Sequence, residues 1–250
     1  MKKKKRKYVK AISIAVFLIL CAYILITFLY TPFEKSYTVE VQSSEKMIAL
    51  TFDDGPGKYT GELLEGLKEE NIKATFFLLG KHIDGYEEIV KQMQNDGHLI
   101  GNHTYDHCTL FNTSLEDYIR ELQETDEKIA AITGESTVFF RPPHGFYTGS
   151  RLNGIDKIAI LWSKDPADWK HQDADYVYEY LMKNAADGRI ILLHDTKPTT
   201  VEGVLRAIKD LKEQGYEFVR VDELLCRNGD GLAPGIAYRS CKNNGSPIYF

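Results

Sequence analysis

Apolar runs alternate with amphipathic segments along most of the chain after residue 46. Short runs rich in apolar residues are typical of buried strands. They occupy residues 47–51, 74–79, 138–140, 159–161, 190–193 and 217–219. The segments between these runs have the periodicity of helices. Strands that alternate with helices over about 180 residues predict a parallel α/β sheet or barrel.

The clearest predicted helix begins at Ser114, because Asp117 three residues later completes an arrangement like a capping box. Gly134 follows the helical pattern and indicates where it ends. The apolar residues on one face of this helix are Leu115, Ile119, Leu122, Ile129 and Ile132. A second helix is predicted over residues 173–186, ahead of Gly188.

The N-terminal sequence predicts a membrane anchor. Residues 2–7 are all lysine or arginine, and residues 11–30 contain no charged side chain. A helix of about 20 residues is about 30 Å long and crosses the apolar core of a bilayer. Basic residues before such a span favour a cytoplasmic N-terminus. We therefore expect a cytoplasmic basic segment over 1–10, a single-pass helix in the cell membrane over 11–30 and a stalk over 31–45, with the rest of the chain extracellular.

A cleaved signal peptide is the alternative for this N-terminus. Signal peptides have a shorter apolar region of about 7–15 residues, which ends in small side chains. Here residues 28–32 read Phe-Leu-Tyr-Thr-Pro, which offers no such cleavage site. The length of the apolar run and its bulky end favour the anchor.

Charge and cysteine content exclude two further classes of protein. The chain has 31 basic and 36 acidic residues. Since seven of the basic residues lie within residues 1–10, the remainder has 24 basic residues against 36 acidic ones. Such an acidic body is not suited to nucleic acid, whose phosphates need clustered cations. Four cysteines in 250 residues are too few for a disulfide scaffold.

Two groups of potential metal ligands follow predicted apolar runs. Asp53 and Asp54 follow the first strand, although Asp-Gly-Pro sequences also form ordinary acidic turns. His103 and His107 follow the apolar pair 99–100, and their spacing places both imidazoles on one face of a helical turn. Two imidazoles and one carboxylate can hold a divalent cation and leave positions open for water, as in catalytic metal sites.

Three further polar clusters follow apolar runs. The sequence Arg-Pro-Pro-His-Gly occupies residues 141–145, and two aspartates precede a tryptophan within residues 165–169. His194 and Asp195 follow the run that ends at residue 193. Each cluster alone is compatible with a plain loop. Because chemistry in α/β folds gathers at the carboxyl ends of strands, five polar clusters at five strand ends predict one active site.

In this order the clusters resemble the motifs of the polysaccharide deacetylase family, which is also called carbohydrate esterase family 4 or the NodB homology domain. The matching sequences are Thr-Phe-Asp-Asp-Gly-Pro (51–56), His-Thr-Tyr-Asp-His (103–107), Arg-Pro-Pro-His-Gly (141–145), Asp-Trp (168–169) and Leu-Leu-His (192–194). The resemblance covers residues 46–226, so that residues 227–250 would form a C-terminal extension. It implies a distorted (β/α) barrel, here preceded by one N-terminal transmembrane helix.

The resemblance also implies roles for individual residues. Asp54, His103 and His107 would bind a divalent metal, often zinc, although cobalt, nickel or manganese also suit such ligands. Asp53 would act as the catalytic base and His194 as the catalytic acid. These five side chains, which are distant in the chain, would then have to converge on one cation.

Supporting roles follow from the same resemblance. Arg141 would orient and tune Asp53, and Asp168 would do the same for His194. Trp169 and Leu192 would form walls of the pocket that takes the acetyl methyl group. His144 stands where the family usually has tyrosine, whose backbone N–H helps to hold the oxyanion. Because a backbone donor does not depend on the side chain, we expect this exchange to spare the chemistry, while the imidazole could alter sugar preference or offer the metal a further ligand.

The expected function is hydrolytic removal of N-acetyl groups from a cell-envelope polysaccharide that contains N-acetylglucosamine, with peptidoglycan first. Alternative substrates are chitin-like oligomers, poly-N-acetylglucosamine and O-acetylated xylan, and a non-catalytic glycan-binding protein is the alternative from another class. The expected partners are the polysaccharide and, through residues 11–30, the lipid bilayer. Outside the cytoplasm, Cys226 and Cys241 could close a disulfide, worth roughly 3 kcal/mol for a loop of about 15 residues.

Overall fold

The computed structural model describes residues 36–42, 44–241 and 247–249. Within these residues seven strands form a closed barrel in the order β1-β2-β3-β4-β5-β8-β6, and β6 pairs back to β1. Neighbouring strands are parallel except β8 and β6, which are antiparallel. The barrel strands are β1 (Met47–Gly55), β2 (Thr75–Leu78), β3 (Leu99–Asn102), β4 (Phe139–Phe140), β5 (Ile158–Ile160), β6 (Arg189–His194) and β8 (Ala237–Cys241). The distorted (β/α) barrel predicted from the sequence is therefore confirmed.

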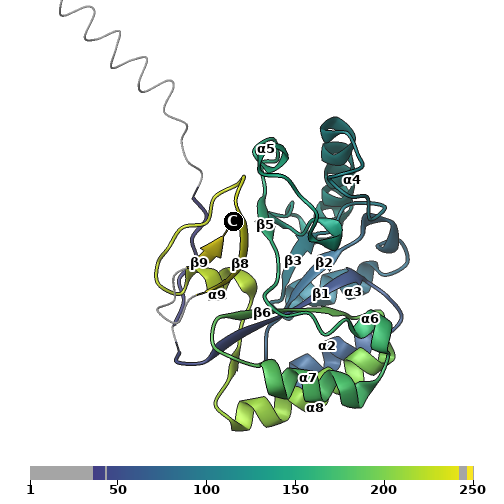
Figure 1. Ribbon diagram of the computed structural model, residues 1–250. Helices are drawn as coiled ribbons and strands as arrows, with labels where there is room; N and C mark the ends of the chain where they lie inside the picture. The colour runs from purple at the N-terminus through teal and green to yellow at the C-terminus, as the bar shows by residue number, and fades with distance from the viewer. Residues whose placement is uncertain (1–35, 43, 242–246, 250) are drawn as a thin grey trace, which may run out of the picture. The chain divides into compact units, whose positions relative to one another are not determined.

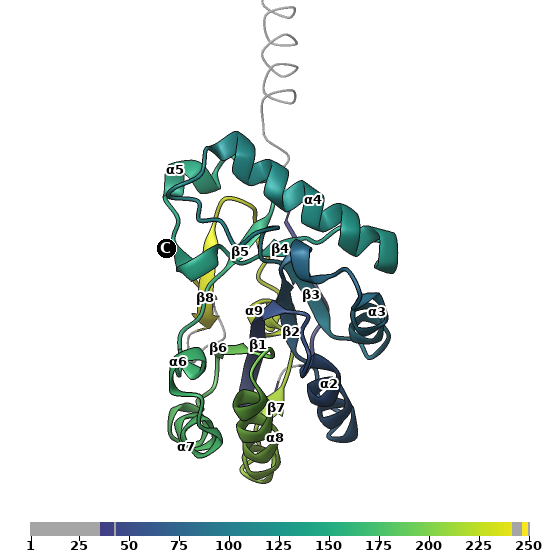
Figure 2. The same ribbon diagram turned by 90° about the vertical axis from the view of Figure 1, so that its right-hand side faces the viewer.

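The strands form the central barrel, and the longer helices lie around it (Figure 1 and Figure 2). These longer helices are α2 (Thr60–Glu69), α3 (Glu87–Asn95), α4 (Leu115–Thr133), α7 (Ala174–Asn184) and α8 (Pro198–Glu213). Shorter helical segments are α5 (Gly149–Leu152), α6 (Asp168–His171), α9 (Val221–Cys226) and the 3₁₀ helices η1 (Gly80–His82) and η2 (Pro143–Gly145). Two further strands extend the sheet, because β7 (Glu217–Phe218) pairs with the start of β1 and β9 (Pro247–Tyr249) pairs with β8.

Side chains of β1 alternate between two apolar layers. Those that pack toward the outer helices are Ile48, Leu50 and Phe52. Those that pack in the interior of the barrel are Met47 and Ala49. Since side chains alternate with a period of two along a strand, Asp53 at the end of β1 also lies on the interior side. The same alternation in β6 brings His194 to the interior side, directly beside its pairing partner Asp53.

The predicted α4 helix forms between the expected residues, but its buried face is rotated. Ser114 Oγ accepts the Asp117 N–H at 3.1 Å, and Gly134 ends the helix with a φ of 84°. The buried side chains of the helix are Tyr118, Leu122, Thr125 and Ile129. The sequence-based prediction counted only aliphatic residues, so it included Ile119 and missed the aromatic ring of Tyr118, which is completely buried.

The last barrel strand lies in the region expected to form a C-terminal extension. β8 pairs with both β5 and β6 and thereby closes the barrel. Cys226 and Cys241 are both buried as free thiols, in contrast to the disulfide considered from the sequence. Their sulfur atoms face different groups, since Cys241 Sγ donates to Leu224 O at 3.1 Å and Cys226 Sγ lies 3.9 Å from Tyr37 O.

The predicted basic segment over 1–10, the predicted anchor over 11–30 and the first part of the predicted stalk lie outside the described residues. Among the helices that are described, none has the length and apolar character needed to cross a membrane. The later part of the predicted stalk contacts the barrel. Tyr37 forms an antiparallel bridge with Leu232, and its hydroxyl donates to the buried Asp222 at 2.8 Å.

Candidate active site

The pairing of β1 with β6 places the predicted base and acid side by side. Asp53 and His194 are neighbours at the carboxyl ends of these two parallel strands. Active sites of parallel barrels lie at this end, where the loops after the strands converge. A cavity of about 430 Å³ opens here. Eight of the ten predicted site residues line it: Asp53, Asp54, His103, His107, His144, Trp169, Leu192 and His194.

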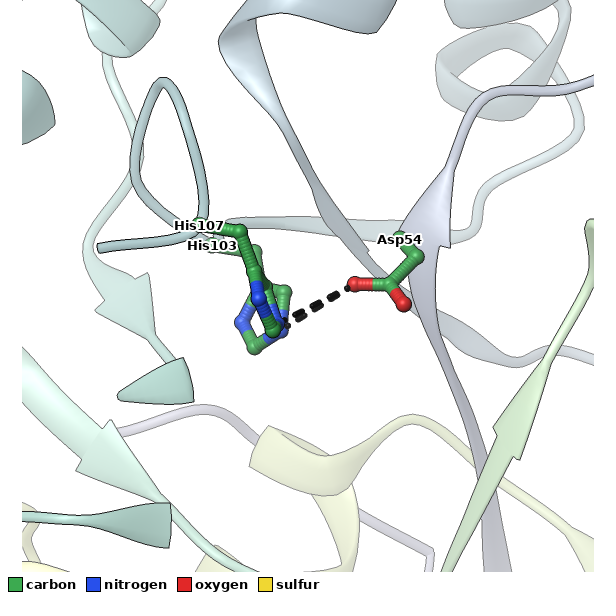
Figure 3. Close-up of side chains that lie close together, drawn as sticks. All are labelled: Asp54, His103 and His107. Carbon is green, nitrogen blue, oxygen red and sulfur yellow. Dashed lines mark ion pairs between the residues drawn. The ribbon is translucent and has the colours of Figure 1, made fainter. Parts of the chain in front are cut away.

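Asp54, His103 and His107 form the one group in the described part of the chain whose donor atoms are close enough to share a metal ion. Their ligand atoms all lie within 4.8 Å of one another. Asp54 Oδ1 is 3.5 Å from His103 Nε2 and 3.4 Å from His107 Nε2. Both imidazoles turn toward the Asp54 carboxylate, although the two histidines come from the loop after β3 and the aspartate from the end of β1 (Figure 3).

Protonation and hydrogen bonding in this group fit a cation. His103 Nδ1 lies 2.8 Å from Arg141 O, and because a carbonyl only accepts, Nδ1 carries the proton and Nε2 presents a lone pair. Burial lowers the pKa of His103 to about 3 and also lowers the pKa of His107, so both imidazoles are neutral at pH 7. Asp54 Oδ1 is buried without a hydrogen-bond partner. An unpartnered carboxylate oxygen that faces two neutral imidazoles is a donor set suited to a divalent transition metal.

Left-handed backbone conformations are concentrated in the loops of the site. Asp54, Thr104, His107 and His144 have φ angles of 67°, 70°, 64° and 58°. Side chains disfavour this region, and the β-branched Thr104 disfavours it most. Such conformations persist where the surrounding structure holds them, commonly at functional sites. The end of β1 and the loops after β3 and β4 therefore carry backbone strain at or beside residues that line the cavity.

Arg141 holds Asp53 from behind the cavity. Its Nη1 donates to Asp53 Oδ1 and to Thr51 Oγ1, both at 2.8 Å. Its Nε and Nη2 donate to the backbone carbonyls of Ile160 and Leu161, each at 3.1 Å. Burial raises the pKa of the Asp53 carboxyl, and the positive charge of Arg141 opposes that rise. A carboxylate with a raised pKa takes up a proton more readily, which suits a general base.

Asp168 holds His194 in a matching arrangement. Asp168 Oδ1 accepts the His194 Nδ1–H at 2.8 Å, and Oδ2 accepts the His194 backbone N–H at 2.8 Å and the Thr200 hydroxyl at 2.7 Å. Burial alone would lower the pKa of His194. The hydrogen bond and charge of Asp168, together with the charges of Asp53 and Asp54, raise this pKa to about 9. His194 is therefore charged at pH 7 and directs Nε2 toward the cavity.

His144 of η2, Trp169 of α6 and Leu192 of β6 also line the cavity. The His144 ring meets the His107 ring edge-on, with 4.7 Å between their centroids. His144 is not among the residues close enough to share the ion, so the structure does not place it as the further ligand considered from the sequence. Trp169 is 53% exposed at the mouth, whereas Leu192 is 5% exposed in the wall.

Asp195 and Thr60 are supporting residues that sequence reasoning did not assign. The Thr60 hydroxyl donates to Asp195 Oδ2 at 2.5 Å and accepts the Gly57 N–H at 2.8 Å. The Asp195 carboxylate also lies against Gly55, where a Cβ atom would come within 2.5 Å of it. This contact joins the end of β1, which carries both aspartates, and the turn after it to the end of β6, which carries His194. Asp195 was visible as part of a polar cluster, but its partner is distant in the sequence.

Comparisons with known proteins agree with these features. A family model described as polysaccharide deacetylase matches residues 40–160. The peptidoglycan-N-acetylglucosamine deacetylase PgdA of Listeria monocytogenes is 38% identical over 196 residues, which are 78% of this chain and 41% of that protein. The chain thus spans less than half the length of that relative. A peptidoglycan-N-acetylglucosamine deacetylase of Bacillus cereus is 35% identical over 207 residues, which are 78% of this chain and 75% of that protein.

A solved structure shows the same likeness in three dimensions. The family 4 acetyl xylan esterase of Clostridium thermocellum, in complex with a cobalt ion, superposes with a TM-score of 0.69 at 34% identity. The match covers 74% of this chain and 92% of the esterase. Sequence motifs, closed barrel, site geometry and these relatives lead to one conclusion. The chain belongs to the polysaccharide deacetylase family.

Proposed function

We propose that this protein is a metal-dependent hydrolase that removes N-acetyl groups from N-acetylglucosamine units of a cell-envelope polysaccharide. The observation that carries this proposal is the convergence of Asp54, His103 and His107 in one cavity with Asp53 and His194. Amide hydrolysis needs an activated water and a protonated leaving group. The cavity holds a buried carboxylate and a charged imidazole for these two tasks.

Asp54, His103 and His107 would hold the cation. A divalent cation bound there would supply Lewis acidity, which acidifies a water and polarises the acetyl carbonyl. We propose zinc as the physiological metal, because two imidazoles and one carboxylate are common ligands of catalytic zinc. Cobalt, nickel and manganese suit the same donors, and the related esterase carries cobalt.

Asp53 would take the proton of the attacking water, and Arg141 would keep the carboxylate oriented through Oδ1 while it does so. His194 would then donate its Nε2 proton to the departing nitrogen, while Asp168 accepts the Nδ1–H and stabilises the charged ring. The backbone N–H of His144 would help to hold the oxyanion. Leu192 and Trp169 would enclose the acetyl methyl group.

Peptidoglycan is the substrate that we propose first. Two relatives are named for deacetylating the N-acetylglucosamine of peptidoglycan. O-acetylated xylan is a second candidate, because the related structure is that of an acetyl xylan esterase. Chitin-like oligomers and poly-N-acetylglucosamine offer the same acetamido group. A protein that only binds glycan would need neither the Asp53–Arg141 pair nor the His194–Asp168 pair.

We also propose that residues 11–30 anchor the protein in the cell membrane, with the catalytic domain outside. The proposal rests on the uncharged run behind a basic segment. Membrane fractionation combined with N-terminal sequencing of the mature protein tests it. We expect an intact N-terminus in the membrane fraction, and a soluble protein that lacks residues 1–30 would contradict it.

Acetate release from purified protein tests the activity. The substrates are peptidoglycan, N-acetylglucosamine oligomers, poly-N-acetylglucosamine and acetylated xylan, each with protein treated with chelator and then reconstituted with Zn²⁺ or Co²⁺. We expect acetate from peptidoglycan, a loss after chelation and recovery with metal. Glycan binding without acetate release from any substrate would instead support the non-catalytic alternative.

A further inference from the structure

Large exposed apolar side chains are few among the described residues, and two of them lie in or near the active-site cavity. The four are Phe111, Val138, Phe146 and Trp169. Trp169 lines the cavity, and Phe146, which is 56% exposed, follows η2 in the same loop as His144. Removing apolar surface from water is favourable, and contiguous apolar surface beside a cleft marks ligand-binding grooves.

The loop after β4 is built to hold His144 and Phe146 in place. His144 and Gly145 have φ angles of 58° and 68° in consecutive positions. A Cβ atom on Gly145 would lie 3.0 Å from the Trp162 ring, so the turn presses closely on a residue of the cavity wall. Only glycine combines this close approach with a left-handed conformation at no steric cost.

Three rings form a row that leads away from the metal ligands. The His107 and His144 ring centroids are 4.7 Å apart, and the His144 and Phe146 ring centroids are 5.8 Å apart. His144 belongs to the cavity lining, whereas Phe146 lies beyond it. The aromatic surface therefore continues from the reaction site to a position outside the cavity.

We propose that His144 and Phe146 form an outer sugar-binding subsite, which holds a sugar adjacent to the one that loses its acetyl group. The proposal rests on the proposed function and specifies its substrate as an extended chain of pyranose sugars rather than a single sugar. The faces of a pyranose ring are lined with C–H groups, and the face of an aromatic ring is partly negative. Stacking of the two removes apolar surface of Phe146 from water.

The size and position of this surface favour a sugar over a protein or a lipid bilayer. A stable protein interface buries about 800 Å² on each partner, which one phenylalanine and one imidazole do not provide. The two rings are continuous with the cavity through His144, so a chain that places its acetamido group at Asp53 passes close to them. His144, where the family usually has tyrosine, thereby acquires a role in sugar binding.

Substrates of increasing length test the subsite. For the metal-loaded wild-type protein we expect kcat/KM to rise with chain length from the disaccharide to the hexasaccharide of N-acetylglucosamine. In Phe146→Ala we expect the increase in kcat/KM from disaccharide to hexasaccharide to be about tenfold smaller, mainly because KM for the long substrates is higher. His144→Ala should act in the same direction, and His144→Tyr should restore the length dependence because it keeps an aromatic ring.

Val138→Ala is the matched control. Val138 is also exposed, at 43%, but it precedes β4 and lines a separate cavity with His98. We expect it to keep the wild-type length dependence. Identical length profiles for Phe146→Ala, Val138→Ala and the wild type would overturn the subsite.

Calorimetric titration with the pentasaccharide separates this outcome from a failure of the proposed function. Weaker binding by Phe146→Ala without any acetate release would retain the subsite and refute the hydrolase, and equal or absent binding would refute the subsite.

Discussion

Asp53 and His103 lie only 3.7 Å apart, between Oδ2 and Nε2, yet their replacement should have different consequences. Asp53→Asn keeps an oxygen that can accept from Arg141, but an amide cannot take a proton from water. We expect a loss of turnover of about 10²–10⁴-fold with metal still bound. His103→Ala removes a ligand, so metal and turnover should both be lost.

Metal content after dialysis and acetate release from the same samples measure these two effects. Asp106→Asn is the matched control, because this carboxylate lies between the two histidines in the sequence but is 67% exposed and pairs with Lys81. It should keep both metal and activity. Near-normal deacetylation by Asp53→Asn would rule out its role as the base.

At the scale of elements, the contact between the turn after β1 and the end of β6 depends on one hydroxyl group. Thr60→Val keeps the shape of the side chain but leaves the Gly57 N–H and the buried Asp195 carboxylate without that partner. Unsatisfied buried groups cost about 1–3 kcal/mol each. We expect the free energy of unfolding to fall by at least 1 kcal/mol or so, measured by urea denaturation.

Thr199→Val provides the control for this measurement. The Thr199 hydroxyl is buried at the start of α8 without a hydrogen-bond partner in the structure. Its replacement should therefore leave the free energy of unfolding nearly unchanged. Equal stability of Thr60→Val and Thr199→Val would show that the hydroxyl does not couple the two strand ends.

Long apolar runs and helix caps made several elements predictable from the sequence. β1 and β6 are recognisable because their residues are buried on both faces, and α4 because Ser114 caps it. β8 was not predicted as a strand, and β3 was represented only by the apolar pair 99–100 at its start. β3 ends in Gly101 and Asn102, and β8 contains Arg239 and Ser240, so neither has a continuous apolar run. Their place in the barrel is set by pairing with neighbours distant in the sequence.

At the scale of the whole molecule, stability should fall in acid because of a buried histidine that lines a different cavity from the metal ligands. His98 is 6% exposed, and its Nδ1 accepts the Ala74 N–H at 3.1 Å. Burial, assisted by Lys73, lowers its pKa from 6.5 to about 4. The folded protein therefore resists protonation that the unfolded chain accepts below about pH 6.5.

Between about pH 6.5 and pH 4 the unfolded state binds the proton and the folded state does not, so the free energy of unfolding decreases as the pH falls. The loss is about 1.4 kcal/mol per pH unit and about 3 kcal/mol in total. Urea denaturation across this range should show a shallower decline for His98→Gln than for the wild type. His171→Gln, which changes an exposed ring, should show the same pH dependence as the wild type. If the free energy of unfolding of His98→Gln declined as steeply as that of the wild type, the assignment to His98 would be contradicted.

The active site was more predictable than the strands, because its motifs are short and chemically specific. The spacing of His103 and His107 indicated that they could share a cation, and the family resemblance supplied Asp54. The expected helical turn was wrong, because the two histidines lie in an irregular loop with left-handed backbone at Thr104 and His107. Supporting contacts such as Thr60 with Asp195 join residues 135 apart in the chain, and no local pattern reveals them. Burial also determines properties that a motif does not specify, such as the raised pKa of Asp53 beside Arg141.

Asp54, His103 and His107 are proposed to bind one catalytic cation between Asp53 and His194. Anomalous diffraction at the zinc absorption edge, from crystals of the zinc-loaded protein, tests it most directly. We predict one strong peak in the cavity at about 2.0–2.2 Å from Asp54 Oδ1 and from Nε2 of both histidines, and no such peak in His103→Ala crystals. A peak on other side chains, or an empty cavity in a zinc-loaded active enzyme, would contradict the account.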